Sequence, residues 1–133
     1  MAALVDSCVL LDVLEDDPKW FRWSCRALAS QANTSKLILN AVVYAEVSIG
    51  FQQVEELEAV LPSTVFEVRA IPREAAFLAG KCFLKYRRRG GPRTRPLPDF
   101  LIGAHAAVEG LSLITRDPRH FRSYFPTVHL ICP

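Results

Sequence analysis

The sequence predicts an α/β domain of three layers, in which helices cover both faces of a central, mainly parallel β-sheet. Short apolar segments alternate along the chain with longer segments whose apolar residues recur every three to four positions, the spacing of one helix face. Short continuous apolar strands between helices are typical of a parallel sheet buried on both sides. A length of 133 residues, of which 50% are hydrophobic, fits one domain at 1–133 with a substantial core.

The first half of the chain is expected to contain two strands and four helices. Pro18 precedes a helix, Asn40 is a favourable N-cap, and Pro62 ends a helix. The apolar segments between these boundaries are short enough to be buried strands. In chain order we expect a strand at 2–5, helices at 9–14 and 19–32, a strand at 37–39, and helices at 41–51 and 53–61.

The second half continues the alternation. The helix that opens at Pro72 should end near Arg89, because Gly90-Gly91-Pro92 does not continue a helix comfortably. We expect its buried face to carry Ala76, Phe77, Gly80, Phe83 and Leu84. The further elements expected are a strand at 65–68 before this helix, then a proline-rich loop at 93–98, a helix at 99–109 ended by Gly110, a strand at 111–114, a helix at 118–125 and a strand at 128–131.

Charge and cysteine content narrow the class of protein. The net charge of +2 is too small for a general polyanion binder, although six basic residues lie between Lys85 and Arg95. The four cysteines are scattered without a C-x-x-C pair, which argues against a zinc site. Reduced thiols fit a cytoplasmic protein. No apolar run approaches the roughly 18 residues of a membrane span, so we expect no membrane segment.

Four acidic residues adjoin segments expected in the core: Asp6, Glu46, Asp99 and Asp117. Asp6 and Asp117 lie just past expected strands, and sites in parallel sheets form beyond the carboxyl ends of strands. Converging carboxylates repel one another unless a cation lies between them, and a divalent metal is the simplest candidate. The three aspartates have an alternative role as helix N-caps, which is compatible with metal binding. Glu46 has few polar neighbours, so we expect it to point into a polar site or an interface.

Four segments resemble the acidic motifs of PIN-domain ribonucleases. They are Val5-Asp6-Ser7-Cys8-Val9-Leu10-Leu11, Tyr44-Ala45-Glu46-Val47, Leu97-Pro98-Asp99-Phe100-Leu101-Ile102-Gly103-Ala104-His105-Ala106 and Leu113-Ile114-Thr115-Arg116-Asp117-Pro118-Arg119-His120-Phe121. The compact length is similar to that of the VapC toxins of toxin–antitoxin pairs. The resemblance implies a fold with a central parallel sheet flanked by helices, in agreement with the order of elements above.

The same resemblance implies a chemistry and partners. It implies an endoribonuclease that depends on Mg²⁺ or Mn²⁺, with Asp6, Glu46, Asp99 and Asp117 as the acidic ligands. Thr115 would orient a carboxylate or a water, and Ser7 would assist. It also implies a homodimer and a small antitoxin protein with a basic tail.

Basic residues near the acids are candidates for contact with the RNA backbone. Arg93 and Arg95 immediately precede Asp99, and Arg116 precedes Asp117. For the basic residues at 85–89, complementing the dipole of a helix end is an alternative that needs no ligand.

Other functions remain open or are disfavoured. The same fold could hold RNA or a protein without cutting it. A phosphate-handling signalling or hydrolase domain is disfavoured because no D-x-D motif follows the first strand and no G-x-x-x-x-G-K-[ST] loop occurs. A Rossmann cofactor site is disfavoured because G-x-G-x-x-G is absent. We expect His105 to have a packing or surface role and His120 to lie on a helix surface.

Overall fold

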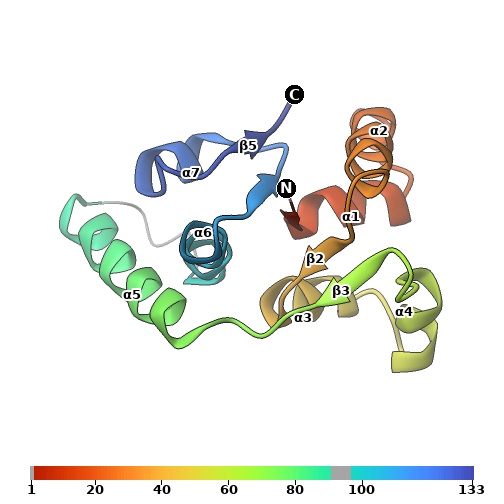
Figure 1. The fold of residues 1–133 in the computed structure, drawn as a ribbon, viewed down its shortest axis with the longest axis horizontal. Helices are drawn as coiled ribbons and strands as arrows, with labels where there is room; N and C mark the ends of the chain where they lie inside the picture. Colours follow the sequence, from red (N-terminus) through yellow and green to blue (C-terminus); the bar gives the residue numbers. More distant parts are fainter. Residues whose placement is uncertain (1, 91–96) are drawn as a thin grey trace.

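The computed structural model describes residues 2–90 and 97–133, in which five strands alternate with seven helices (Figure 1). The strands are β1 (Ala3–Val5), β2 (Leu37–Leu39), β3 (Phe66–Val68), β4 (Ser112–Ile114) and β5 (Leu130–Ile131). The helices are α1 (Ser7–Leu14), α2 (Phe21–Ala32), α3 (Ala41–Ser48), α4 (Val54–Val60), α5 (Arg73–Arg88), α6 (Leu97–Glu109) and α7 (Arg119–Tyr124). Every expected strand and helix is present, with ends shifted by up to three residues.

The sheet is parallel throughout, with its strands in the order β3-β2-β1-β4-β5. From the central strand β1 the chain moves outward to β2 and β3, then returns to β4 on the other side of β1. The connections that leave β1 and β4 therefore run in opposite directions. Such a reversal opens a crevice at the carboxyl ends of the two strands, where ligands of α/β proteins bind. Asp6 follows β1 and Thr115 follows β4, so the topology brings both residues to this crevice.

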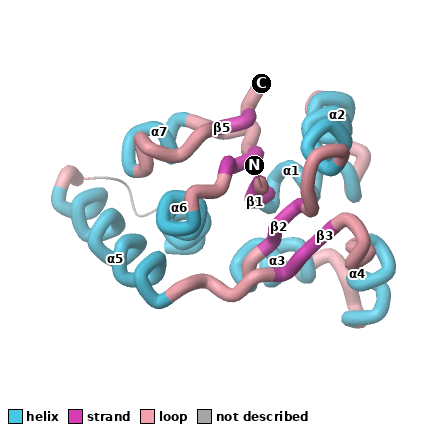
Figure 2. The backbone as a smooth tube through the Cα atoms, viewed as in Figure 1, coloured by secondary structure: helices cyan, strands magenta, loops and turns pink. Residues whose placement is uncertain are grey.

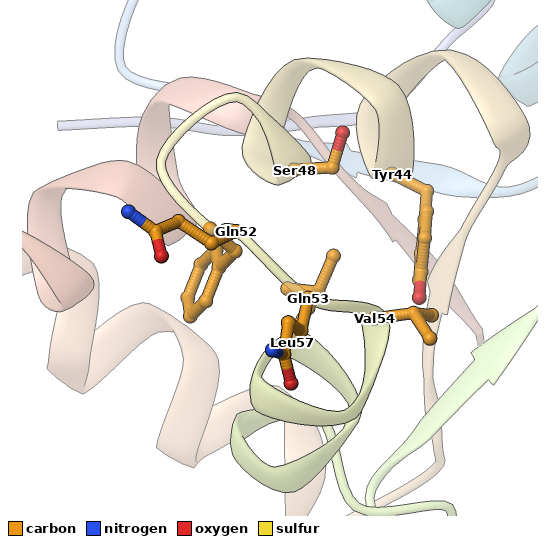
Figure 3. Close-up of a pocket in the computed structure, with 7 residues that line it drawn as sticks. Tyr44, Ser48, Gln52, Gln53, Val54 and Leu57 are labelled. Atoms are coloured by element: carbon orange, nitrogen blue, oxygen red, sulfur yellow. The ribbon is translucent and has the colours of Figure 1, made fainter.

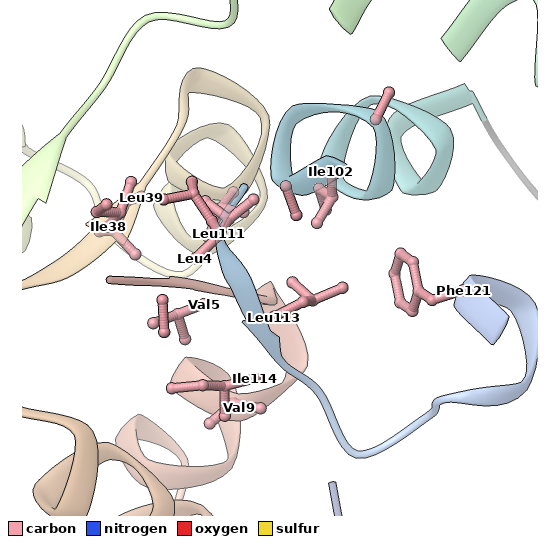
Figure 4. Close-up of a cluster of buried hydrophobic side chains, with 14 of the residues drawn as sticks. Leu4, Val5, Val9, Ile38, Leu39, Ile102, Leu111, Leu113, Ile114 and Phe121 are labelled. Carbon is pink, nitrogen blue, oxygen red and sulfur yellow. The ribbon is translucent and has the colours of Figure 1, made fainter. Parts of the chain in front are cut away.

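Helices cover both faces of the sheet, as the sequence predicts. In Figures 1 and 2, α1 and α2 lie on one side of the strands, whereas α5, α6 and α7 lie on the other. The core between them is closely packed around the inner strands (Figure 4). Leu4, Ile38 and Leu113 expose at most 1% of their surface. Each such side chain contributes about 1.5–3 kcal/mol of hydrophobic free energy, so the central strands anchor the crevice residues firmly.

Helix α6 packs closely against the segment that contains α7. A Cβ atom at Gly103 would overlap the ring of Phe125 and lie 3.1 Å from Cδ1 of Phe121. Gly110 ends the helix with a φ of +65°, a conformation that glycine adopts without strain. The Leu111 amide then donates to the Ala106 carbonyl at 2.9 Å, which closes the helix end and leads directly into β4.

The buried face expected for α5 is wrong at four of its five positions, and Phe83 alone of the five packs against the core, with its ring centroid 5.4 Å from that of Phe100. The helix buries Ala75, Ala79, Cys82 and Tyr86, one position away from the face that we expected. Phe77 is 68% exposed and has the ammonium group of Lys81 5.2 Å from its ring centroid. The small side chains of Ala75 and Ala79 let α5 approach α6 closely, so packing against α6 decides which face is buried rather than the size of the apolar residues.

Two histidines lie in the interior. The expected surface position of His120 is wrong, because this residue is 6% exposed and packs edge-on against Phe100 with ring centroids 4.4 Å apart. His105 is fully buried, with Nδ1 3.1 Å from Nδ2 of Asn40 and Nε2 3.0 Å from Oε1 of Glu109. These pairs connect α6 to Asn40 at the end of β2, so His105 has a packing role within a polar network.

None of the described helices has both the length and the apolar character needed to cross a membrane.

Candidate active site

Asp6 is the acid most firmly placed at the crevice. It stands at the N-cap position of α1 with an extended backbone, yet its side chain makes no capping hydrogen bond. Its Oδ2 atom instead accepts hydrogen bonds from Thr115 Oγ1 at 2.8 Å and from Cys8 Sγ at 3.4 Å. The residue is only 7% exposed. The capping alternative therefore does not account for the position of this carboxylate.

Thr115 connects the ends of the two central strands. It is fully buried, and while it donates to Asp6 its Oγ1 atom accepts a hydrogen bond from the Asp117 amide at 3.1 Å. Asp6 in turn is tied to β4 because its amide donates to the Ile114 carbonyl at 2.9 Å. This one hydroxyl group thus fixes the first acid and the backbone of the fourth.

Glu46 reaches the same region from α3. The N-cap predicted for this helix is present, because Oδ1 of Asn40 accepts from the Val43 amide at 3.0 Å. One and a half turns into the helix, Glu46 Oε1 accepts from Ser7 Oγ at 3.0 Å, a bond that spans 39 positions of sequence. The structure therefore places Glu46 beside the residue that follows Asp6.

Asp99 and Asp117 line a cavity of about 180 Å³ together with Asp6. Ser7, Cys8, Arg116 and Phe121 are the other described residues that line it. Asp99 lies in the first turn of α6 rather than at an N-cap, because this helix begins at Leu97. Asp117 is exposed at the rim, and Pro118 rather than Asp117 occupies the N-cap position of α7. Three of the four acids therefore share one hollow, and Glu46 is joined to it through Ser7.

The acids influence one another electrostatically. Burial raises the pKa of Asp6 to about 6, although the hydrogen bonds from Thr115 and Cys8 act in the opposite direction. The negative charges of Asp99 and Glu46 add to this rise. Burial also raises the pKa of Glu46, against the hydrogen bond from Ser7 and with a contribution from Asp99. The repulsion predicted for converging carboxylates is thus present among three of the four.

The donor atoms suit a hard divalent cation. Within residues 2–90 and 97–133, no three His, Cys, Asp or Glu side chains are close enough to form a ready-made metal site. Mg²⁺, however, commonly uses only one or two carboxylates and keeps several waters. The carboxylate of Asp6 is buried, is held by hydroxyl and thiol donors, and is repelled by neighbouring acids, so a cation beside it would relieve an unfavourable charge.

Two residues near the cavity were not identified from the sequence. Cys8 contacts Asp6, and burial raises the pKa of its thiol to about 12, with the charge of Asp6 adding to the effect. Asp12 is 2% exposed and pairs with Arg116, whose Nε lies 2.9 Å from Oδ2. The sequence did contain a sign of the role of Asp12, because this acid is flanked on both sides by apolar residues in α1, much as Glu46 is in α3. Arg93 and Arg95, expected to contact RNA, lie outside the described residues.

A second hollow lies between α3 and α4, and its lining has a different chemistry (Figure 3). This cavity has a volume of about 250 Å³ and is lined by Tyr44, Ser48, Phe51, Gln52, Gln53, Val54 and Leu57. None of the described residues that line it is an aspartate or a glutamate, so the acidic cavity at the ends of β1 and β4 is the better candidate for metal and phosphate chemistry.

A comparison with known families identifies the fold. The profile of the PIN domain matches residues 3–125, which is nearly the whole chain. The chain belongs to the PIN domain family. All four acids of the candidate site fall inside the matched range: Asp6 directly after β1, Glu46 in α3, Asp99 in α6 and Asp117 in the segment after β4. No curated protein sequence matches this PIN domain at a significant level.

Solved structures share the fold over the full length of this PIN domain. VapBC2 from Rickettsia felis, bound to a DNA fragment of its promoter, has 18% identity and a TM-score of 0.74, with 100% of this chain and 99% of that chain covered. VapBC-1 from nontypeable Haemophilus influenzae has 18% identity and a TM-score of 0.74, with 99% and 98% covered. The FitAcB structure from Neisseria gonorrhoeae has 19% identity and a TM-score of 0.72, with 97% and 96% covered. At these identities the likeness establishes the fold.

Proposed function

We propose that this PIN domain is a metal-dependent endoribonuclease and the toxin of a type II toxin–antitoxin pair. The observation that carries the proposal is the buried Asp6 carboxylate, which lies in one cavity with Asp99 and Asp117 and within electrostatic reach of Glu46. Structural stability alone does not explain such an arrangement, because a buried carboxylate next to other acids destabilises the fold.

Asp6, Glu46, Asp99 and Asp117 would hold Mg²⁺ or Mn²⁺, some of them directly and others through water. When bound, the ion would lower the pKa of a water and stabilise the negative charge that develops on the phosphate. The protein contributes the orientation of the acids. Thr115 fixes the carboxylate of Asp6, and Ser7 fixes that of Glu46.

RNA and an antitoxin are the proposed partners. Arg116 lines the acidic cavity, and together with Arg93 and Arg95 it would contact the RNA backbone. A further structural neighbour, with 23% identity and a TM-score of 0.70, is a toxin–antitoxin complex from Klebsiella pneumoniae. An acidic cavity is complementary to the basic tail of a small antitoxin. We further propose that the protein forms a homodimer and acts in the cytoplasm, where its cysteines, which are all free, stay reduced.

The test is the substitution Asp6→Asn, compared with Asp16→Asn as a matched control. Asp16 is an exposed aspartate in the loop after α1, and asparagine is well suited to its positive φ of 53°. Purified proteins are incubated with end-labelled RNA, with Mg²⁺ or with a chelator, and the products are separated on a gel. We expect the wild type and Asp16→Asn to cut RNA only with the metal, and Asp6→Asn not to cut it.

Two results would contradict the proposal. Cleavage by Asp6→Asn at the wild-type rate would show that Asp6 is not part of the site. RNA binding by the wild type without cleavage, in the presence of Mg²⁺ or Mn²⁺, would favour the alternative of a non-cleaving PIN-like binding module.

A further inference from the structure

Of the described residues that line the acidic cavity, Arg116 is the one with a positive charge, and it is held from two directions. Its Nε atom donates to both carboxylate oxygens of Asp12, at 2.9 and 3.1 Å. Its guanidinium carbon lies 5.9 Å from the ring centroid of Trp20, within the range of a cation–π contact. An arginine side chain ordinarily samples many rotamers, so this double attachment determines where the guanidinium group points.

Asp12 is itself held rigidly. It projects from α1, is 2% exposed, and accepts a hydrogen bond from Ser24 Oγ of α2 at 2.8 Å. Ser24 is fully buried. A carboxylate buried to this extent is unfavourable unless it is paired, and here the pair reaches from the interface of α1 and α2 to the crevice beyond β4.

The geometry leaves the outer part of the guanidinium group available. Within the described part of the chain, Arg116 makes its hydrogen bonds through Nε alone. Nη1 and Nη2 form the planar fork that matches two phosphate oxygens. Because Arg116 lines the cavity together with Asp6 and Asp99, a phosphate bound by this fork would lie next to the acids.

The pairing with Asp12 also keeps the guanidinium group from pairing with the metal-site acids. Among the described residues, the hydrogen bonds of Arg116 go to the carboxylate of Asp12, at 2.9 and 3.1 Å. An arginine without Asp12 would be drawn toward the metal-site acids, where it would occupy the place of a metal ion. Asp12 therefore separates the two kinds of charge that RNA cleavage needs.

We propose that Asp12 is a positioning residue, which aims Arg116 at a phosphate of the RNA backbone beside the acidic cavity. The inference rests on the proposed function, since it names how the same site holds its substrate.

The experiment is a double-mutant cycle on RNA affinity. Binding of a fluorescent single-stranded RNA is measured by anisotropy in the presence of a chelator, over a series of salt concentrations. The proteins are the wild type, Arg116→Gln, Asp12→Asn and the double variant. Arg73→Gln is the control, because it removes the same charge from an exposed arginine at the first residue of α5.

We expect Arg116→Gln to weaken binding by about tenfold and to reduce the slope of log affinity against log salt by about 0.7, the value for one phosphate contact to a single strand. Asp12→Asn should weaken binding several-fold on its own and have no further effect in the Arg116→Gln background. Arg73→Gln should match the wild type in affinity and slope. If Asp12→Asn fails to fold, Ser24→Ala loosens Asp12 without removing its charge and should weaken binding only while Arg116 is present.

Three outcomes separate the inference from the proposed function. Unchanged affinity of Arg116→Gln, or an equal effect of Asp12→Asn with and without Arg116, would overturn the inference even if the wild type cleaves RNA. An RNA-binding wild type that shows the expected cycle but never cleaves would overturn the nuclease proposal and leave the role of Asp12 standing. A wild type that does not bind RNA at all would overturn both.

Discussion

Replacing Thr115 by valine tests whether its hydroxyl group holds the acidic site together. The substitution preserves the shape of a fully buried side chain but removes the bond to Asp6 at 2.8 Å and the bond from the Asp117 amide at 3.1 Å. A hydrogen bond to a charged acceptor contributes about 1.5–3 kcal/mol, and a neutral one about 0.5–1.5 kcal/mol. We therefore expect the free energy of unfolding to fall by about 2–4.5 kcal/mol where Asp6 is ionised, because both bonds are lost.

The pH dependence of this loss makes the prediction specific. Asp6 has a pKa of about 6, so it is ionised at higher pH and protonated at lower pH. At about pH 8 the variant loses a charge-assisted bond, whereas at about pH 5 it loses a neutral one, so the loss should be smaller by about 1 kcal/mol in acid. Urea denaturation of the metal-free protein at both pH values measures the difference. Thr127→Val, at an exposed threonine after α7, is the matched control. An effect of Thr115→Val no larger than that of the control, or equal at both pH values, would refute the reasoning.

Two further predictions concern the effect of ionised Asp6 on the free energy of unfolding and the packing of α6. The pKa of Asp6 rises on folding from 3.8 to about 6, so its contribution to stability is present in acid and is lost as the pH rises through about 6. In the absence of metal, Asp6→Asn should therefore be more stable than the wild type by about 1–3 kcal/mol at about pH 8, and this difference should shrink toward pH 4. Urea denaturation measures it, and a variant less stable than the wild type at high pH would contradict the prediction. Gly103→Ala should lower the free energy of unfolding by about 1–3 kcal/mol, because the new methyl group overlaps Phe125. The control is Gly80→Ala, in an exposed helical position with no atom of a neighbouring element within 4 Å of the new Cβ. It should be neutral or stabilising by up to about 1 kcal/mol. Similar denaturation midpoints for the two variants would contradict the packing argument.

Much of the fold could be predicted from the sequence because local signals mark its elements. Asn40 caps α3 as expected, and Gly110 ends α6 in the left-handed conformation that favours glycine. The side of a helix that becomes buried is a different kind of information. In α5 the apolar residues lie on more than one side, and the close approach of α6 selects the face with Ala75 and Ala79. Which face is buried depends on the partner helix, and the periodicity of one segment carries no information about that partner.

The candidate site could be predicted only in part. The apolar surroundings of Asp6 and Glu46 marked them as unusual, and the parallel topology explains why acids from separate segments meet. The contact between Ser7 and Glu46 spans 39 positions, and that between Thr115 and Asp6 spans 109. Such pairings follow from strand order, which chain-local patterns do not determine. Asp12 has apolar neighbours in the sequence, as Glu46 has, but it is also the first residue of an acidic stretch at 12–17. Such a stretch is typical of a solvent-exposed surface, so the sequence did not single out Asp12 as a site residue.

The contacts of Asp6 separate a structural role from a functional one. An aspartate kept only as an N-cap would accept a bond from the first turn of its helix and gain stability from it. Asp6 makes no such bond, and burial and its acidic neighbours raise its pKa, so in the metal-free protein the ionised side chain opposes folding. Thr115 and Cys8 offset part of this penalty with their hydrogen bonds. Asp6 is thus an unfavourable carboxylate whose orientation is fixed by a buried hydroxyl group. This combination is expected of a site that binds a cation. The sign of the stability change in Asp6→Asn is therefore informative. Replacing a structural acid would lower the free energy of unfolding of the metal-free protein, whereas replacing a metal-binding acid would raise it.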